Sequence, residues 1–234
     1  MKKHLPIATL ALTCSVLAAC GGSSNNNSNT AVSTPSYEIT VVNLTNNQPL
    51  SPVAVIAHTE AFSPWAIGTA ASEGLERLAE GGDNGMFIGA DIADQDAVGE
   101  SGAGIVPPGS SETFTVSTNA NTQNRLTIAT MFVNTNDAFV GLGGVDVSGL
   151  AVGDSITRTA PIYDAGTEAN TEAAGTIPGP ADGGTGFDAT RDDIGDRVSR
   201  HSGVVSVDDG LTTSVLNESH RFDAPGIRVT ITRQ

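Results

Sequence analysis

Two carboxylates stand four positions apart in the segment Asp164-Ala165-Gly166-Thr167-Glu168, directly after an alternating stretch that is typical of a β-strand. Calcium takes six to eight oxygen ligands at about 2.3–2.6 Å, so it needs carboxylates and carbonyls that converge from a flexible turn. Gly166 can supply the positive φ that such a turn requires. The spacing also fits an ordinary turn, in which an Asp side chain bonds the backbone two residues on. The segment alone leaves both interpretations open.

Four other segments accompany this loop in a fixed order. They are His58 followed by Phe62 and Trp65, then Ala71-Ser72-Glu73-Gly74-Leu75, then Phe114-Thr115-Val116, and then Asn134-Thr135-Asn136-Asp137-Ala138-Phe139-Val140-Gly141-Leu142. In this order they resemble the spondin N-terminal domain, the module named for F-spondin and mindin. The resemblance spans about Tyr37 to Asn170, with a weaker match in the last strand-like segment, Gly226 to Thr232.

The resemblance implies a C2-like antiparallel β-sandwich with one calcium ion at one end, in proteins of cell adhesion and extracellular matrix. The metal ligands of the family fall on Asp137, Asp164 and Glu168. The chain departs from the family pattern at Ala138, where the family usually has Trp, and at Glu168, where it often has Asp. We expect Ca²⁺ as the cofactor, with a structural role, because it neutralises acids that would otherwise repel one another.

The beginning of the chain predicts export and lipidation. Residues 1–19 have the composition of a signal peptide, with a basic start and a short apolar core before Leu17-Ala18-Ala19-Cys20. Small residues before a cysteine are typical of a bacterial lipoprotein signal, so we expect lipid on Cys20, and Gly21 after it favours the outer membrane. A simple secretory signal with a coincidental cysteine is the alternative. Residues 20–36 are small and polar, typical of a flexible tether, and residues 37–234 are expected to form the sandwich domain.

The charge and the cysteine content restrict the classes of partner. The chain has 26 acidic and 11 basic residues, a net charge of −15, and no basic cluster interleaved with aromatics. Such a surface repels phosphate backbones, so nucleic acid is excluded as a partner. Cys14 lies in the expected signal peptide and Cys20 at the lipidation site, so no disulfide is expected in the domain.

Strand patterns dominate the rest of the chain. They are Tyr37–Leu44, Val53–Thr59, Glu112–Ser117, Arg125–Val133, Ser155–Ile162 and Gly226–Thr232. One helix is expected to begin at the N-cap Ser72 and to end at Gly81-Gly82, and a second is predicted over Asp188–His201. The segments Gly81–Gly109 and Gly175–Gly186 are rich in Gly and are expected to be long surface loops.

Other chemistry-bearing residues have competing interpretations. His58 ends a strand and is expected to be hydrogen-bonded and structural, and Trp65 is expected to anchor a loop or the core. Three further groups of acids are interpreted as solvated loop or hairpin acids rather than ligands: Asp91, Asp94 and Asp96; Asp192, Asp193 and Asp196; and Asp208-Asp209-Gly210.

The sequence therefore favours a calcium-binding adhesion or interaction module, anchored by lipid at the bacterial envelope, whose partner is an extracellular or envelope protein or glycan. No catalytic residues are predicted, because no HExxH, Gly-x-Ser-x-Gly or phosphate-binding glycine loop occurs. Two alternatives stay open. One is an envelope hydrolase that uses loop acids and His58, and the other is a structural lipoprotein without a specific ligand.

Overall fold

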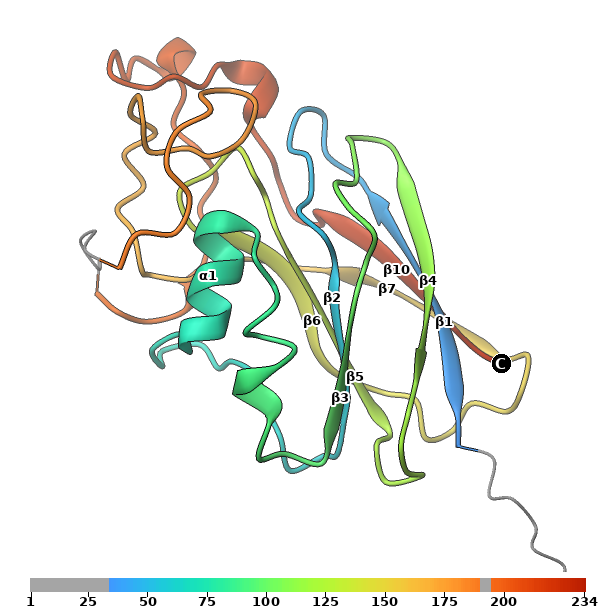
Figure 1. Ribbon diagram of the computed structural model, residues 1–234. Coiled ribbons are helices and arrows are strands. Elements are labelled where there is room, and N and C mark those ends of the chain that lie inside the picture. Colours follow the sequence, from blue (N-terminus) through green and yellow to red (C-terminus); the bar gives the residue numbers. More distant parts are fainter. Residues whose placement is uncertain (1–33, 190–194) are drawn as a thin grey trace, which may run out of the picture. The chain divides into compact units, whose positions relative to one another are not determined.

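The computed structural model describes residues 34–189 and 195–234 of the chain (Figure 1). The expected signal peptide (1–19), the lipidation site Cys20, most of the tether (20–36) and the acids Asp192 and Asp193 lie outside the described residues. No helix in the described ranges is both long and apolar enough to span a bilayer.

Two antiparallel sheets form a β-sandwich, as predicted. One sheet has the strand order β4-β1-β10-β7 and the other has the order β3-β2-β5-β6-β8-β9. The strands are β1 (Ser36–Asn43), β2 (Ala54–His58), β3 (Ala97–Ser101), β4 (Ser111–Ser117), β5 (Arg125–Met131), β6 (Ala138–Asp146), β7 (Ser155–Ala160), β8 (Ile162–Asp164), β9 (Ser199–Arg200) and β10 (Ile227–Arg233). In Figure 1 the first sheet lies on the right and the second crosses the centre of the molecule.

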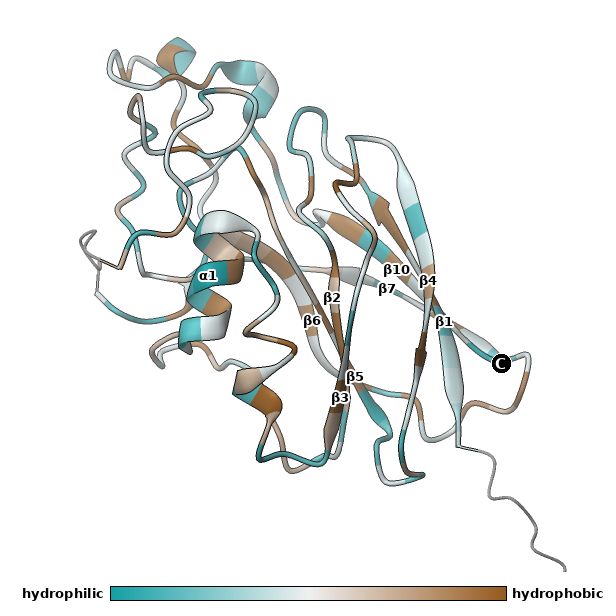
Figure 2. Ribbon diagram, viewed as in Figure 1, coloured by the Kyte–Doolittle hydropathy of each residue, from teal (hydrophilic) through white to brown (hydrophobic). Residues whose placement is uncertain are grey.

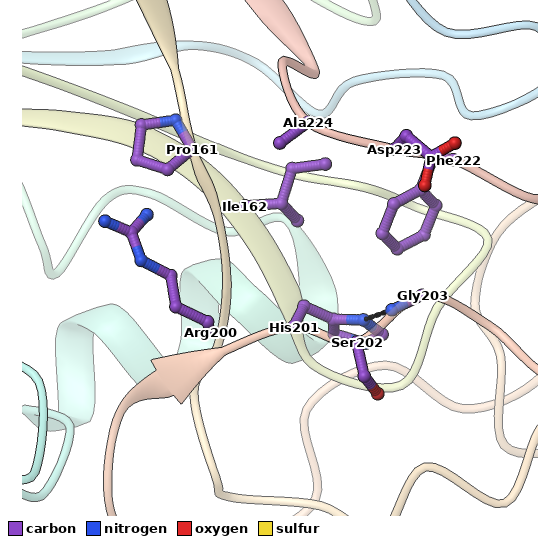
Figure 3. Close-up of a pocket in the computed structure, with 9 residues that line it drawn as sticks. All are labelled: Pro161, Ile162, Arg200, His201, Ser202, Gly203, Phe222, Asp223 and Ala224. Carbon is purple, nitrogen blue, oxygen red and sulfur yellow. Dashed lines mark hydrogen bonds between the residues drawn. The ribbon is translucent and has the colours of Figure 1, made fainter.

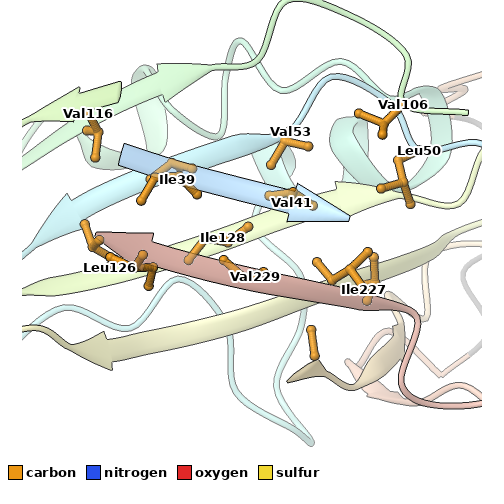
Figure 4. Packing of buried hydrophobic residues seen from close by; sticks show 14 of the residues in the cluster. Ile39, Val41, Leu50, Val53, Val106, Val116, Leu126, Ile128, Ile227 and Val229 are labelled. Carbon is orange, nitrogen blue, oxygen red and sulfur yellow. The ribbon is translucent and has the colours of Figure 1, made fainter. Parts of the chain in front are cut away.

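The space between the sheets is filled by branched aliphatic residues. On β1 the side chains of Ile39 and Val41 are fully buried, and Thr40 between them is not, which is the period-two pattern of a sheet with one apolar face. Val229 and Ile231 repeat the pattern on β10. Figure 4 shows Ile39, Val41 and Val229 facing Leu126 and Ile128 of the other sheet, so alternation along each strand decides which face becomes core.

The outer face of the four-stranded sheet carries hydroxyl groups. Register places Thr113, Thr40, Thr230 and Thr157 side by side on β4, β1, β10 and β7. The hydroxyls of Thr40 and Thr113 lie 2.8 Å apart, and those of Thr157 and Thr230 lie 3.1 Å apart. This face therefore satisfies its polar groups between strands and remains open to solvent.

A helix covers the outer face of the six-stranded sheet. Helix α1 (Glu73–Gly81) begins where the Leu75 amide donates to Ser72 Oγ (3.2 Å), and it ends at Gly82 in the left-handed conformation, as predicted. Its buried residues Leu75 and Leu78 pack in a second apolar cluster with residues of β2, β5, β6 and β8. Figure 2 shows the helix alternating between apolar and polar residues while β2 and β5 are mostly apolar. The sandwich thus has a third layer.

Four elements differ from the predictions. The second helix predicted over Asp188–His201 is wrong for the described residues, which contain β9 and bends instead. Gly195 and Asp196 have φ of 83° and 42°, and two consecutive left-handed residues do not belong to a right-handed helix. β3 lies inside the segment expected to be only loop, and the long strand β6 was not predicted as a separate strand. A 3-10 helix, η2 (Val207–Asp209), replaces the hairpin turn expected at Asp208-Asp209-Gly210.

We expect the replacement of Leu78 by Ala to destabilise the domain by about 2–5 kcal/mol, because it opens a cavity under α1. The control Glu73→Ala removes a partly exposed ion pair with Arg77 and is expected to cost less than about 1 kcal/mol. Urea unfolding followed by circular dichroism measures both changes. Equal losses in the two variants would show that α1 is not held by its apolar face.

Candidate functional site

The structure places the predicted acids Asp137, Asp164 and Glu168 on two loops that contact each other. Asp137 immediately precedes β6, and Asp164 is the last residue of β8. These two strands are antiparallel, and Ala138 pairs with Asp164 in their register, so the start of β6 meets the end of β8. Two loops far apart in sequence therefore lie against each other at one end of the six-stranded sheet.

Backbone hydrogen bonds join the two loops directly. The amides of Thr167 and Glu168 donate to Asp137 Oδ2, at 2.9 and 3.2 Å, and the Ala165 amide donates to the Asp137 carbonyl at 3.2 Å. A carboxylate that accepts two amide N–H groups is a strong acceptor, because the charge strengthens each bond. Asp137 thus organises the loop that carries Glu168.

The loop after β8 is shaped by its own first residue. Asp164 Oδ1 accepts from the Gly166 amide at 2.8 Å, and Asp164 Oδ2 accepts from Asn170 Nδ2 at 2.6 Å. Gly166 has φ of 75°, as expected for a tight turn, and a Cβ there would collide with the backbone of Arg197. The bond from Asp164 to the amide two residues on is the one that the plain-turn alternative predicts.

The electrostatic environment of Asp137 is unusual. The residue is fully buried, and its Oδ1 has no hydrogen-bond partner among the described residues. Burial raises the pKa of this carboxyl to about 8, with smaller contributions in the same direction from the charges of Asp164 and Glu80, while the amides of Thr167 and Gly166 lower it. A buried carboxyl in this state needs either a proton or a positive charge.

Two buried acids near this site were not predicted. Glu80 is 1% exposed on the inner side of α1, and its charge acts on Asp137. Glu172, four residues after Glu168, is 2% exposed and accepts from the Val205 amide at 3.1 Å, and burial raises its pKa. Glu80 follows Leu78 and Ala79 near the end of the predicted helix, which was the only signal for its burial.

The candidate metal ligands at this end of the sandwich are oxygen atoms. Carboxylates and turn carbonyls are the ligands that calcium and magnesium prefer, and nitrogen or sulfur ligands are absent from the predicted set. Within residues 34–189 and 195–234, no three or more His, Cys, Asp or Glu side chains are grouped so as to hold a metal ion. The unpartnered Asp137 Oδ1 and the negative surroundings fit a hard cation.

Three of the other loop acids, Asp91, Asp96 and Asp209, have structural contacts. Asp91 Oδ2 accepts from Ser72 Oγ at 2.5 Å, beside the start of α1. Asp96 accepts from Thr122 Oγ1 and Gln123 Nε2, at 3.0 and 2.8 Å. Asp209 closes η2 by accepting from the Ser206 amide and hydroxyl. These contacts account for the acids as elements of turns and caps.

His58 and Trp65 have the structural surroundings that were expected. His58 is buried, with Nδ1 2.8 Å from the Thr59 carbonyl and Nε2 2.9 Å from Thr127 Oγ1. Burial lowers the pKa of its imidazole. Trp65 packs edge-on against Phe139 and Tyr163, with ring centroids 5.3 and 5.7 Å apart. It therefore anchors the loop after β2 to the second apolar cluster, beside the acidic loops.

No protein-family model matches the chain, and no curated protein matches it.

Asp137 predicts a specific pH dependence for the metal-free protein. Its pKa lies near 8 in the folded state and near 3.8 as the ordinary value, so between these pH values the folded state binds more protons than the unfolded state. Stability therefore falls as pH rises through this window, by at most about 1.4 kcal/mol per pH unit for this one group.

Urea unfolding in chelator at a series of pH values measures this dependence, with Asp137→Asn as the comparison. Subtracting the variant removes the contributions of other groups, including the histidines, whose lowered pKa values act in the opposite direction. The free energy of unfolding of the wild type minus that of Asp137→Asn should fall from pH 5 to pH 8. A constant difference would contradict the raised pKa of Asp137.

Proposed function

We propose that this chain is a lipid-anchored module of the bacterial cell envelope that binds Ca²⁺ and uses the ordered end of its sandwich for adhesion or another extracellular interaction. In this proposal it is a bacterial member of the spondin N-terminal domain family, with the C2-like topology of that family. Cys20 carries the lipid, and the outer membrane holds the anchor.

One observation carries the calcium part of the proposal. Asp137 is fully buried, lies between two loops that also carry Asp164 and Glu168, and has one oxygen without a hydrogen-bond partner among the described residues. Burial of a carboxylate is strongly unfavourable unless a cation or hydrogen bonds compensate it. A divalent cation compensates Asp137 and Asp164 together, which a single proton does not.

Asp137, Asp164 and Glu168 are the side chains that would hold the ion. When bound, calcium supplies positive charge that neutralises these acids and fixes the loops. Asp137 meanwhile keeps the following turn in place through the amides of Thr167 and Glu168, and Asp164 holds Gly166 and Asn170. The role is structural, since these residues order a surface rather than activate a nucleophile.

The interaction part of the proposal rests on the resemblance and on the kind of surface. A fold alone does not determine a function, so the family supports adhesion only by analogy. Long loops gather at one end of the sandwich, in orange and red in Figure 1, and loops held on a rigid scaffold are a common place for binding. The net charge of −15 argues against nucleic acid as the partner, so the proposed partner is a protein or a glycan.

The hydrolase alternative gains no support from His58. Both ring nitrogens already have hydrogen-bond partners, in Thr59 and Thr127, and the ring is buried beneath Phe62. A general base needs a nitrogen within reach of a substrate proton. The alternative of a structural lipoprotein is favoured by the bond between Asp164 and the Gly166 amide, because that bond shapes the loop without any ion.

Thermal unfolding in calcium and in chelator tests the proposed site. A ligand that binds only the folded state at about a hundred times its Kd stabilises it by about 2.7 kcal/mol, and for a domain of this size each kcal/mol raises Tm by roughly 2–4 °C. We expect this increase in the wild type and its loss in Asp137→Asn and in Asp164→Asn. Asp94→Asn, which changes an exposed loop acid, is the matched control and should keep it.

Magnesium should produce a smaller increase, because it requires a smaller octahedral site and gives up water reluctantly. Identical melting temperatures in calcium and in chelator, with no change in the two site variants, would contradict the calcium proposal. The alternative of a structural lipoprotein would then be favoured.

A capture experiment tests the interaction separately from the metal. The mature protein is immobilised through its lipidated end and exposed to envelope proteins and to a glycan panel, with calcium or with chelator. We expect a specific partner to be retained in calcium and to be released by chelator, and Asp137→Asn to weaken retention in calcium. If neither chelator nor Asp137→Asn alters the retention of the partner, the interaction surface lies away from this end of the sandwich.

A further inference from the structure

A pocket of about 340 Å³ lies beside the acidic loops but is lined by other residues (Figure 3). It is formed where β8 and β9 meet the segment that leads into β10. Its lining includes Pro161, Ile162, Arg200, His201, Phe222 and Asp223. The volume is at the small end of ligand pockets, which suits a ligand of the size of an amino acid or a dipeptide.

The apolar walls of the pocket are fixed by the core. Ile162 is 4% exposed and belongs to the cluster between the sheets. The Phe222 ring packs edge-on against Phe132, with centroids 4.9 Å apart, and lies 5.2 Å from the His201 ring. Because these side chains are held by packing, the pocket is formed before any ligand arrives.

One charged group on the lining is positive and has no carboxylate partner in the described part of the chain. The guanidinium of Arg200 lies 4.6 Å from the centre of the Tyr163 ring, which supports it from one side. No ion pair or hydrogen bond of its side chain occurs among the described residues. A planar guanidinium held in this way presents paired donors that match a carboxylate.

The ring of His201 forms part of the lining. The Gly203 amide donates to His201 Nδ1 at 2.9 Å, so the neutral ring carries its proton on Nε2. Nε2 is buried and has no hydrogen-bond acceptor among the described residues. Because Nε2 is closed to solvent, it is not open to a ligand, and the exposed guanidinium of Arg200 is the group that makes this part of the pocket suited to an anion.

A negative group completes the lining. Asp223 is exposed and forms no ion pair with Arg200 or with any other residue that the structure describes. In Figure 3 the Asp223 carboxylate and the Arg200 guanidinium lie on different sides of the pocket, with Ile162 and Phe222 between them. The two charges are therefore available to a molecule that enters between them.

We propose that this pocket binds an apolar zwitterion of the size of an amino acid or dipeptide, whose carboxylate contacts Arg200 and whose ammonium group contacts Asp223. The apolar side chain of the ligand packs on Phe222 and Ile162. A purely anionic ligand would be repelled by Asp223 and by the acidic chain, and a purely cationic one by Arg200. The site is separate from the proposed calcium site, since none of Asp137, Asp164 and Glu168 lines it, and only the charge of Asp164 acts on the buried ring of His201.

Titration of the full-length chain with leucyl-leucine, its C-terminal amide and its N-acetyl derivative tests the proposal. We expect the free dipeptide to bind with a Kd on the order of a millimolar, because the two charged groups are exposed and the ligand is small. Removal of either ligand charge is expected to weaken binding about tenfold or more. Binding in chelator should equal binding in calcium, which separates this site from the calcium proposal.

Two variants assign the contacts. Arg200→Gln should bind the free dipeptide about tenfold more weakly and should no longer distinguish it from the amide, and Asp223→Asn should do the same for the N-acetyl derivative. Arg158→Gln, which changes an exposed arginine of β7 outside the pocket, is the matched control and should bind as the wild type does.

All three substitutions are at exposed positions, and unchanged melting temperatures confirm that they fold. Absence of binding at millimolar dipeptide, equal binding of all three ligands, or full binding by Arg200→Gln would each overturn the proposal.

Discussion

The end of the sandwich depends on one buried carboxylate. Asp137 is fully buried, and its Oδ2 accepts the amides of Thr167 and Glu168, so it fixes the loop after β8 to the turn before β6. Its second oxygen has no partner among the described residues, and its pKa is raised to about 8. A protein that buries a carboxylate with half of its hydrogen-bonding capacity unmet retains an unfavourable charge unless something compensates it. This imbalance is the physical reason to propose a cation here.

The rest of the fold holds this carboxylate in place. The cluster between the sheets fixes β6 through Val140, and the cluster under α1 fixes it through Phe139, which stacks on Tyr163 of β8 at 5.0 Å. Both faces of β6 are therefore buried at the point where Asp137 precedes it. Helix α1 also brings Glu80 near Asp137, so the layer that stabilises the sheet increases the negative potential at the site. The packing of β6 and α1 therefore determines both the stability of this sheet and the charge around Asp137.

The sequence alone was sufficient for the elements that depend on local pattern. Alternation along β1, β4 and β10 and the cap at Ser72 predicted a β-sandwich with one helix, and these features are present. Patterns failed where burial on both faces removes alternation, as at β6, and where an edge strand such as β3 is short and half-exposed. The wrong helix over Asp188–His201 came from the spacing of Ile194 and Val198, which does not reveal that Gly195 and Asp196 take left-handed backbone conformations.

The contact between the two acidic loops was predicted in part for the same reason. The three acids were identified because the loop pattern is local and resembles a family, and the structure places them on two loops that contact each other. The burial of Glu80 and Glu172 and the pocket beside Arg200 depend on contacts between distant segments, which spacing in one sequence does not encode. Asp164 illustrates the limit, because its turn hydrogen bond is common to the plain turn and to the calcium loop.

The protonation state of Asp137 is the quantity that tests this account most directly. Infrared difference spectroscopy of the wild type against Asp137→Asn, at neutral pH, resolves whether this buried carboxyl is protonated. In chelator we expect a protonated carboxyl band that the variant lacks, and on addition of calcium we expect that band to be replaced by carboxylate bands. If the band is absent in chelator, or if calcium leaves it unchanged, the buried carboxyl does not exchange a proton for a cation and the calcium proposal is wrong.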